Sequence, residues 1–274
     1  MIFDFKSYEA ILPFLGSRRI LLPSVFPDLF DGLKRGAEIL DIGCGDAILA
    51  SALAAQTGAN VTAIDPEPSA IVAARNTVID RNLEKRVQVE QIDWVGALNE
   101  PSANDLILCV HLIYHIDRTL WSELIRSCYD RLKPGGRIVF VTTSKTAKAH
   151  NYFCSSDVIK NIVGRSANLE AIYGNYVFGE DLEEVLAISD VPSAKYTRDF
   201  EISWPFSKSH IKFAKSNQID SIGQSWLRFF SFLYRLPPEV IREEFNDQLE
   251  TRLKVSQHDL SIKGRDVIHV IRKS

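Results

Sequence analysis

The chain has 274 residues, of which 46% are apolar, and 32 basic side chains nearly balance 35 acidic ones for a net charge of −3. A chain of this size buries about three quarters of its unfolded surface, and its lack of excess positive charge disfavours a nucleic-acid partner. No apolar run reaches the length of a membrane span and the first residues lack a targeting pattern, so we expect no membrane partner and a cytoplasmic location.

The first predicted strand, residues 39–42, runs into a glycine-rich turn led by Asp41 and then into a helix that begins near Ile48. Gly43 and Gly45 permit backbone conformations that a side chain would hinder, and they bring bare N–H groups close to a ligand. The N-terminus of the helix directs partial positive charge to the same place. This arrangement predicts a nucleotide pocket.

The type of nucleotide follows from the third glycine position. A dinucleotide-binding loop reads G-x-G-x-x-G, but here that position is Ile48, whose side chain would crowd a pyrophosphate. With Asp41 first and Ala47 last, the segment instead resembles motif I, D-x-G-x-G-x-G, of class I S-adenosylmethionine-dependent methyltransferases. The resemblance implies cofactor contacts by Asp41, Gly43, Cys44 and Gly45.

Two further strands are expected to end in acids. The strand 61–65 places Asp65 about 20 residues after the loop, where a carboxylate accepts from both ribose hydroxyls. The strand 87–93 ends in Asp93, an acceptor for the adenine amino group, and Trp94 offers a flat face to the purine. Alternatively, both acids cap strand ends and Trp94 belongs to the core. The expected cofactor contacts on this side are Asp65, Pro66, Asp93 and Trp94.

The next two strands complete the predicted cofactor-binding half, residues 36–142. Residues 105–110 are nearly all apolar, as expected of a strand buried on both faces. The segment from Leu132 to Phe140 resembles the L-K-P-G-G turn that precedes strand five in the same superfamily. The resemblance implies a Rossmann-like α/β fold, a seven-stranded, mostly parallel sheet with helices on both faces, and a cofactor contact at Val110.

Three side chains that can exchange protons follow the fourth strand: His111, Tyr114 and His115. Open α/β sheets bind ligands outside the carboxyl ends of their strands, so these are our candidate catalytic residues. Methyl transfer from a sulfonium is an in-line displacement that needs alignment, and it needs a base only where the nucleophile must lose a proton. Alternatively, a helix after the strand buries these side chains as packing.

Several signatures are missing from the chain. No [DN]-P-P-[YF] segment follows the fourth strand, no Pro-Cys nucleophile is present, and the strand end lacks the acids of magnesium-dependent catechol enzymes. The four cysteines show no C-x-x-C spacing, so we expect reduced thiols and no zinc. The sequence therefore predicts a small-molecule methyltransferase without a metal. The cysteines are Cys44, Cys109, Cys128 and Cys154.

The last two strands are expected at residues 194–202 and 266–271, which are too far apart for a hairpin loop. The intervening residues, 205–262, repeat aromatic side chains at helical spacing and then contain a Pro-Pro break, which indicates a helical insert. Such an insert would cover the pocket. Its aromatic stripe, including Trp226, belongs either to the core or to a substrate wall.

Four features occur in order along the chain: an opening helix with Phe3, Tyr8 and Phe14, the turn Asp65-Pro66-Glu67-Pro68-Ser69, the segment Leu112-Ile113-Tyr114-His115, and the helical insert. Together they resemble the histamine N-methyltransferase-like group. The resemblance implies that the N-terminal residues 1–35 form a helical cover, that Tyr8 lies over the cofactor or substrate, and that His111 and Tyr114 contact the substrate.

The chain departs from that group where an amine would be held. Arg18 and Arg19 occupy the neighbourhood of the expected acid, and they would repel a cation and pair with a carboxylate. Asp266 is either a substitute anchor for an amine or a solvated charge at the strand edge.

Taken together, residues 1–274 are expected to form one methyltransferase domain that moves a methyl group from S-adenosylmethionine to a nitrogen, or second to an oxygen, of a small-molecule acceptor. One alternative is a catalytically silent S-adenosylmethionine-binding or scaffold protein. Another is an O-methyltransferase that acts on small-molecule carboxylates or hydroxyls. The oligomeric state stays open.

Overall fold

A computed structural model describes residues 22–99, 103–144, 178–189, 191–203 and 261–274. The chain divides into two compact units, of which one comprises residues 18–145, 177–198 and 266–274, and the other residues 1–17, 146–176 and 199–265. Several predicted features lie outside the described residues, and they stay predictions: Tyr8, Arg18, Arg19, Cys154, Trp226 and the helical insert.

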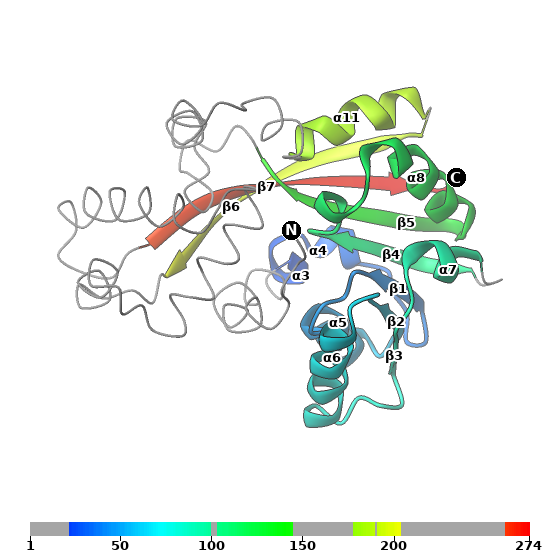
Figure 1. Cartoon of the computed structure of the whole chain (residues 1–274), viewed down its shortest axis with the longest axis vertical. Helices are drawn as coiled ribbons and strands as arrows, with labels where there is room; N and C mark the ends of the chain where they lie inside the picture. Colours follow the sequence, from blue (N-terminus) through cyan, green and yellow to red (C-terminus); the bar gives the residue numbers. More distant parts are fainter. Residues whose placement is uncertain (1–21, 100–102, 145–177, 190, 204–260) are drawn as a thin grey trace. The chain divides into compact units, whose positions relative to one another are not determined.

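Seven strands form a single sheet in the order β3-β2-β1-β4-β5-β7-β6 (Figure 1). The pairs β1–β2, β1–β4, β2–β3 and β4–β5 are parallel, and β7 runs antiparallel to β5. This topology confirms the predicted Rossmann-like α/β class. The strands are β1 (Glu38–Ile42), β2 (Asn60–Ile64), β3 (Val87–Glu90), β4 (Asn104–Val110), β5 (Leu132–Thr143), β6 (Ser193–Ser203) and β7 (Ser261–Arg272).

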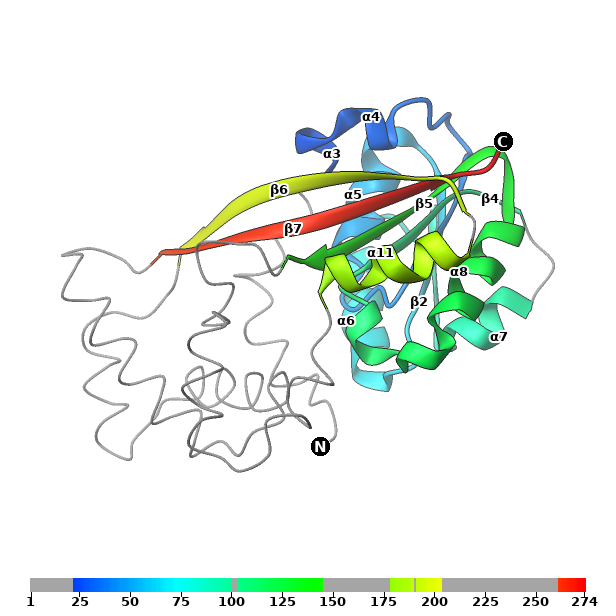
Figure 2. The same cartoon turned by 90° about the horizontal axis from the view of Figure 1, so that it is seen from above.

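Helices cover both faces of the sheet (Figure 2). One buried apolar cluster contains residues of α3, α4, α5 and α6, and the other contains residues of α7, α8 and α11. The helices are α3 (Leu22–Val25), α4 (Pro27–Phe30), α5 (Ile48–Thr57), α6 (Pro68–Asp80), α7 (Trp94–Asn99), α8 (Trp121–Asp130) and α11 (Gly179–Ile188).

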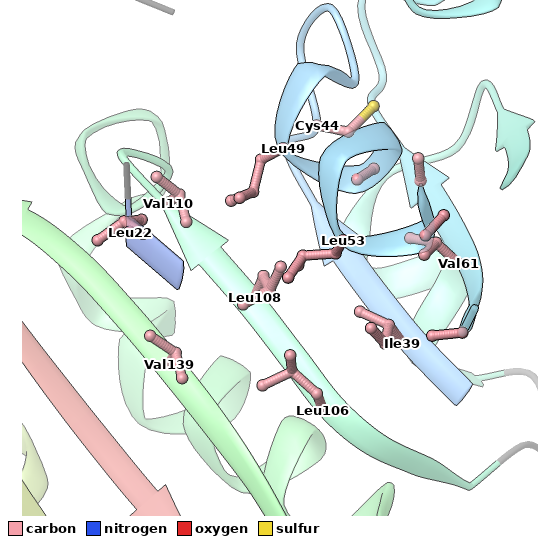
Figure 3. Close-up of a cluster of buried hydrophobic side chains, with 14 of the residues drawn as sticks. Leu22, Ile39, Cys44, Leu49, Leu53, Val61, Leu106, Leu108, Val110 and Val139 are labelled. Carbon is pink, nitrogen blue, oxygen red and sulfur yellow. The ribbon is translucent and has the colours of Figure 1, made fainter. Parts of the chain in front are cut away.

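Alternate residues of each central strand enter opposite clusters because successive side chains of a strand point to opposite faces. In β4, Leu106 and Leu108 pack into the first cluster with Ile39 of β1 (Figure 3), whereas Ile107 and Cys109 pack into the second. A strand buried on both faces has no polar side to present. This explains why β4 is almost entirely apolar in sequence.

The strand order reverses at β1, since β2 pairs with one edge of β1 and β4 with the other. Loops that leave neighbouring strands in opposite directions open a crevice at their carboxyl ends. The glycine-rich turn follows β1, Asp65 follows β2 and His111 follows β4. The fold therefore gathers the predicted site residues at the edge where such sheets bind ligands.

The end of the third strand differs from the sequence prediction. The third strand ends at Glu90, three residues before Asp93, which instead immediately precedes α7. The Oδ1 atom of Asp93 accepts a hydrogen bond from the Gly96 N–H at 2.8 Å. Asp93 is thus an N-terminal cap of a helix, because a short acidic side chain satisfies the first unpaired N–H groups of a helix.

The two charged residues at the centre of the β6–β7 pair are buried. Arg198 and Asp266 form an ion pair at 2.7 Å, and their side chains are 4% and 0% exposed. The prediction that Asp266 is a solvated charge at the strand edge is wrong. Its position opposite Thr143 of β5 encloses it, and Arg198 balances its charge.

His269 of β7 is buried beneath the N-terminus of α11. Its side chain is 1% exposed, and Nε2 lies 3.0 Å from the Gly179 carbonyl oxygen. Because a carbonyl only accepts, Nε2 must carry the proton and donate it. Burial lowers the pKa of His269 below the ordinary imidazole value, so the folded state holds the neutral form.

Stability should therefore fall on acidification through the ordinary imidazole pKa, because the unfolded chain binds a proton that folded His269 resists. One such proton changes the free energy of unfolding by about 1.4 kcal/mol per pH unit, between the unfolded pKa near 6.5 and the lower folded pKa. Urea unfolding of the chain and of His269→Gln measures this slope by difference. Glutamine places an N–H near the Nε2 position and does not titrate, so an unchanged slope in that variant would contradict the assignment.

Candidate active site

The glycine-rich turn keeps its predicted geometry even where its sequence departs from the motif. Gly43, Gly45 and Ala47 have positive φ angles of 71°, 57° and 55°. A Cβ atom on Gly43 would lie 2.7 Å from Leu112 Cδ1. The turn thus combines left-handed backbone with a close approach from the segment after β4.

The sequence suggested that the N–H groups of this turn are bare, but in the structure they donate hydrogen bonds. Those of Gly43 and Cys44 both donate to the Ile64 carbonyl at 2.9 Å, and that of Gly45 donates to Asp65 Oδ2 at 3.1 Å. The turn folds back onto the end of β2, which uses these donors. These hydrogen bonds hold the turn beside Asp65, the residue predicted to bind the ribose.

Asp65 is half-buried and organises the turn in two directions. While Oδ2 accepts from Gly45, Oδ1 accepts from the Glu67 N–H at 3.0 Å. The alternative role as a cap is therefore present, and it is compatible with ligand binding because a carboxylate offers about four acceptor positions. Asp65 is the link between the glycine-rich turn and the start of α6.

A pocket of about 370 Å³ opens beside this turn, within the size range of small-molecule sites. Its walls are mainly aliphatic, and Trp94, which is half-buried, supplies the aromatic surface. Two carboxylates and one imidazole add polar groups. The lining residues are Ile42, Gly43, Ile64, Pro66, Ile92, Asp93, Trp94, Leu112, His115, Ile116, Asp117 and Leu120.

The chain turns sharply after β4 because His111 has a positive φ of 55°. Its N–H still donates to the Val141 carbonyl of β5 at 2.9 Å. The hydrogen bonding between β4 and β5 thus extends one residue beyond the end of β4. A 3₁₀ turn over Ile113–His115 follows, anchored by the buried Ile113 and by the Trp121 indole N–H, which donates to the Ile116 carbonyl at 3.1 Å. Left-handed non-glycine residues cost energy and are common at functional sites.

The three candidate catalytic residues separate into two groups. His115 lines the pocket with Asp93 and Trp94. The rings of His111 and Tyr114 instead stack at 6.0 Å between centroids, with Nδ1 of the histidine 3.1 Å from the tyrosine Oη. His111 precedes the 3₁₀ turn and is left-handed, whereas Tyr114 and His115 are successive residues of the turn and point to different sides.

Thr143, which the sequence analysis did not single out, completes the second group. Its N–H donates to the Tyr114 Oη at 2.6 Å, and that hydroxyl donates to Thr143 Oγ1 at 3.1 Å. Next along the chain, Ser144 donates to Glu180 of α11. The only feature of the sequence that could have identified Thr143 is its place as a polar residue at the carboxyl end of β5. One of its two hydrogen bonds to Tyr114 is made by the backbone, which any residue could provide.

Three other predicted contact residues are buried. Asp41 is 3% exposed inside β1, Cys44 is 3% exposed, and Val110 is 5% exposed in the first apolar cluster. Each of these residues therefore exposes little surface that a ligand could contact.

The three described cysteines, Cys44, Cys109 and Cys128, are buried, and Cys109 and Cys128 are free thiols, as predicted. Burial, with Cys128 close by, raises the pKa of the Cys109 thiol well above its usual value. Such a thiol stays protonated and unreactive.

The described part of the chain holds no group of three or more His, Cys, Asp or Glu side chains arranged to bind a metal ion. Among the described helices, none combines the length and apolarity needed to cross a membrane.

Comparison with known sequences identifies similar proteins. A family described as a methyltransferase domain matches residues 16–216. The ubiquinone biosynthesis O-methyltransferase of Xanthomonas campestris pv. campestris is 33% identical over 114 residues, which cover 42% of this chain and 46% of that protein. Its counterpart from Xylella fastidiosa is 35% identical over 114 residues. The chain spans about half the length of the curated relatives it matches.

Solved structures share the fold at low sequence identity. The YcgJ protein from Bacillus subtilis has a TM-score of 0.57 at 14% identity, with 94% of this chain and 99% of that chain covered. A candidate sarcosine dimethylglycine methyltransferase from Galdieria sulphuraria has a TM-score of 0.54 at 16% identity, with 94% and 86% covered.

Proposed function

Because the chain belongs to the methyltransferase domain family, we propose that it binds S-adenosylmethionine at the carboxyl edge of β1, β2 and β3 and transfers its methyl group to a small-molecule acceptor beside His111. The observation that carries this proposal is the bond from the Gly45 N–H to Asp65 Oδ2, next to a pocket lined by Asp93 and Trp94. It joins an acceptor for ribose hydroxyls to a cavity suited to a purine.

The residues present fit an adenosine group. Asp65 accepts from the ribose hydroxyls, and the aliphatic walls with Trp94 remove the purine from water. Asp93, whose Oδ1 already caps α7, accepts from the adenine amino group with its other oxygen. His115 and Asp117 line the same pocket, and this proposal places them beside the nucleoside and not beside the acceptor.

S-adenosylmethionine supplies an electrophilic methyl group on a positively charged sulfur. The chain must then align a nucleophile and, where the acceptor is a hydroxyl, remove its proton. His111 is the base in this proposal, because it is half-buried at the end of β4 and Tyr114 holds its ring. A neutral imidazole is required, so activity should decline when acid protonates it.

An oxygen acceptor is the first candidate, since a hydroxyl gains most from a base and the curated relatives are named O-methyltransferases. A nitrogen acceptor, which the sequence analysis placed first, is the second candidate. The residues predicted to hold it, Tyr8 and Trp226, and the histamine N-methyltransferase-like subgroup rest on the sequence alone.

Two measurements test the proposal in sequence. Calorimetry should detect binding of S-adenosylhomocysteine and weaker or no binding of NAD, because Ile48 occupies the third glycine position of a dinucleotide loop. Tighter binding of NAD would overturn the cofactor assignment. Purified chain with S-adenosylmethionine and a panel of phenols, amines, imidazoles and carboxylic acids should then form S-adenosylhomocysteine; binding without any turnover on the panel would favour the silent scaffold alternative.

Replacing Asp65 with alanine should weaken S-adenosylhomocysteine binding by about 10- to 150-fold. That range corresponds to the loss of charge-assisted hydrogen bonds worth about 1.5–3 kcal/mol. Calorimetry of the folded variant measures the change. Glu67→Ala is the matched control, since Glu67 caps α6 through Ser69 two residues further on. Equal affinities for the two variants would remove Asp65 from the ribose site.

A further inference from the structure

We propose that Tyr114 and Thr143 are positioning residues that hold the proton of neutral His111 on Nδ1, so that Nε2 is the atom that accepts a proton from the substrate. This inference rests on the proposed function of His111 as the base. It adds two residues and a definite tautomer to that function. The three side chains come from the turn after β4 and from the end of β5, which are neighbouring parallel strands.

The hydrogen bonds at the Tyr114 hydroxyl lead to this tautomer. The Thr143 N–H can only donate, and at 2.6 Å it occupies one acceptor position of Oη. The Tyr114 hydroxyl lies 3.1 Å from Thr143 Oγ1, and the proposal directs its single proton to that oxygen. With the hydroxyl proton in that direction, the contact with His111 Nδ1 at 3.1 Å needs a proton from the histidine.

This arrangement suits a base because the bond strengthens as the reaction proceeds. When Nε2 takes the substrate proton, the imidazole becomes a cation, and Nδ1–H donates to Oη as a charge-assisted hydrogen bond. No proton needs to move along the network. In the opposite arrangement, Tyr114 donates to Nδ1, Nε2 carries the proton, and His111 has no nitrogen left to accept one.

The backbone fixes the point from which the His111 side chain starts, independently of the hydroxyls. His111 is fixed by its positive φ and by its N–H bond to Val141, and Thr143 is buried at 5% exposure. The Oη atom thus bridges two strand ends whose separation the parallel sheet already fixes. Thr143 contributes one backbone donor and one side-chain acceptor, and only the acceptor depends on residue type.

Charged groups near this network come from several elements. His115 lies on the same turn, Glu180 of α11 accepts from Ser144, and Asp266 of β7 lies opposite Thr143 in register, paired with Arg198. The protonation of His111 must therefore be measured from the NMR resonances of its own imidazole ring. A His115→Gln background removes the neighbouring imidazole signal.

Heteronuclear NMR of the isotopically labelled full chain, bound to S-adenosylhomocysteine, measures the tautomer and the pKa without an acceptor. The expected result is protonated Nδ1 and unprotonated Nε2 in neutral His111. Tyr114→Phe removes an acceptor that stabilises the imidazolium, so the pKa of His111 should fall by about one unit. A tyrosine that donates to Nδ1 stabilises the neutral ring, so a rise in the pKa would overturn the proposal, as would no change.

Variants of Thr143 supply the conservative comparison. Thr143→Ser keeps the Oγ acceptor and should retain the Nδ1–H form, whereas Thr143→Val frees the tyrosine proton to turn to Nδ1 and should raise the share of the Nε2–H form. Ser144→Ala, at the next residue, controls for general disturbance of the strand end. If valine leaves the tautomer unchanged, Thr143 has no positioning role. If neutral His111 carries its proton on Nε2 while turnover still depends on His111, this inference alone is contradicted. If turnover does not depend on His111, the proposed function is contradicted.

Discussion

His111→Ala should lower kcat by about 10²–10⁴-fold near pH 7 on an acceptor that must lose a proton, the range expected when a general base is removed. The affinity for S-adenosylhomocysteine should stay within about twofold, since Asp65, Asp93 and Trp94 hold the nucleoside. The acidic limb of the pH profile should disappear with the imidazole. Steady-state kinetics and calorimetry on the same preparations separate the two effects.

His111→Asn is a sharper version of this experiment. Asparagine tolerates the positive φ at this position and its amide reproduces the Nδ1 contact with Tyr114, so only the Nε2 atom is lost. His115→Ala is the matched control, because His115 lines the nucleoside pocket and should change cofactor affinity more than turnover. Near-normal turnover in both His111 variants would reduce catalysis to alignment and desolvation.

Asp266→Ala should destabilise the fold by about 3–5 kcal/mol, because it removes the carboxylate that pairs with the buried Arg198 guanidinium at 2.7 Å. Arginine stays protonated in proteins, so the chain cannot escape this penalty by losing the charge. With a typical folding stability of about 5–15 kcal/mol, the loss is a large fraction of the total. Urea unfolding should reveal it as a lower midpoint at an unchanged slope.

Asp199→Ala supplies the comparison for this variant. Asp199 pairs with Arg265, and its side chain is 70% exposed. The guanidinium of Arg265 lowers the pKa of Asp199, but water screens the pair, and its loss should matter far less. The double variant Arg198→Met/Asp266→Leu should recover much of the stability, since apolar side chains can replace a buried pair. Equal losses for Asp266→Ala and Asp199→Ala would contradict this account.

The same charged residues explain where sequence reasoning about the strands stopped. The runs that pack on both faces, such as residues 105–110, were located to within a residue because apolar content alone identifies them. The last strand begins at Ser261, five residues before its predicted start at Asp266. Charges interrupted the apolar pattern there, and the ion pairs of Arg198 and Arg265 that compensate for them are formed only across strands.

The candidate site divides in a similar way. The interval of 20 residues between Gly45 and Asp65 predicted their proximity, because βα units return the chain to the same edge of the sheet, and a hydrogen bond joins them. Sequence alone did not separate His111 from His115, since their separation depends on a left-handed residue and a 3₁₀ turn. Nor did it identify Thr143, whose N–H carries no residue-type signal.

The positions of the glycine-rich turn also differ in how well they tolerate substitution. At Gly43, a methyl group would meet Leu112 Cδ1 at 2.7 Å, so the leucine side chain would have to move in addition to the cost of a positive φ. At Ala47 the positive φ costs about 1–2 kcal/mol, but the methyl group is completely buried in the first apolar cluster, which offsets part of that cost. Evolutionary drift can therefore exchange glycine and alanine at the third position while holding the first constant. A search for distant homologues that scores backbone dihedral angles at these positions would retain chains such as this one, which a strict three-glycine pattern discards.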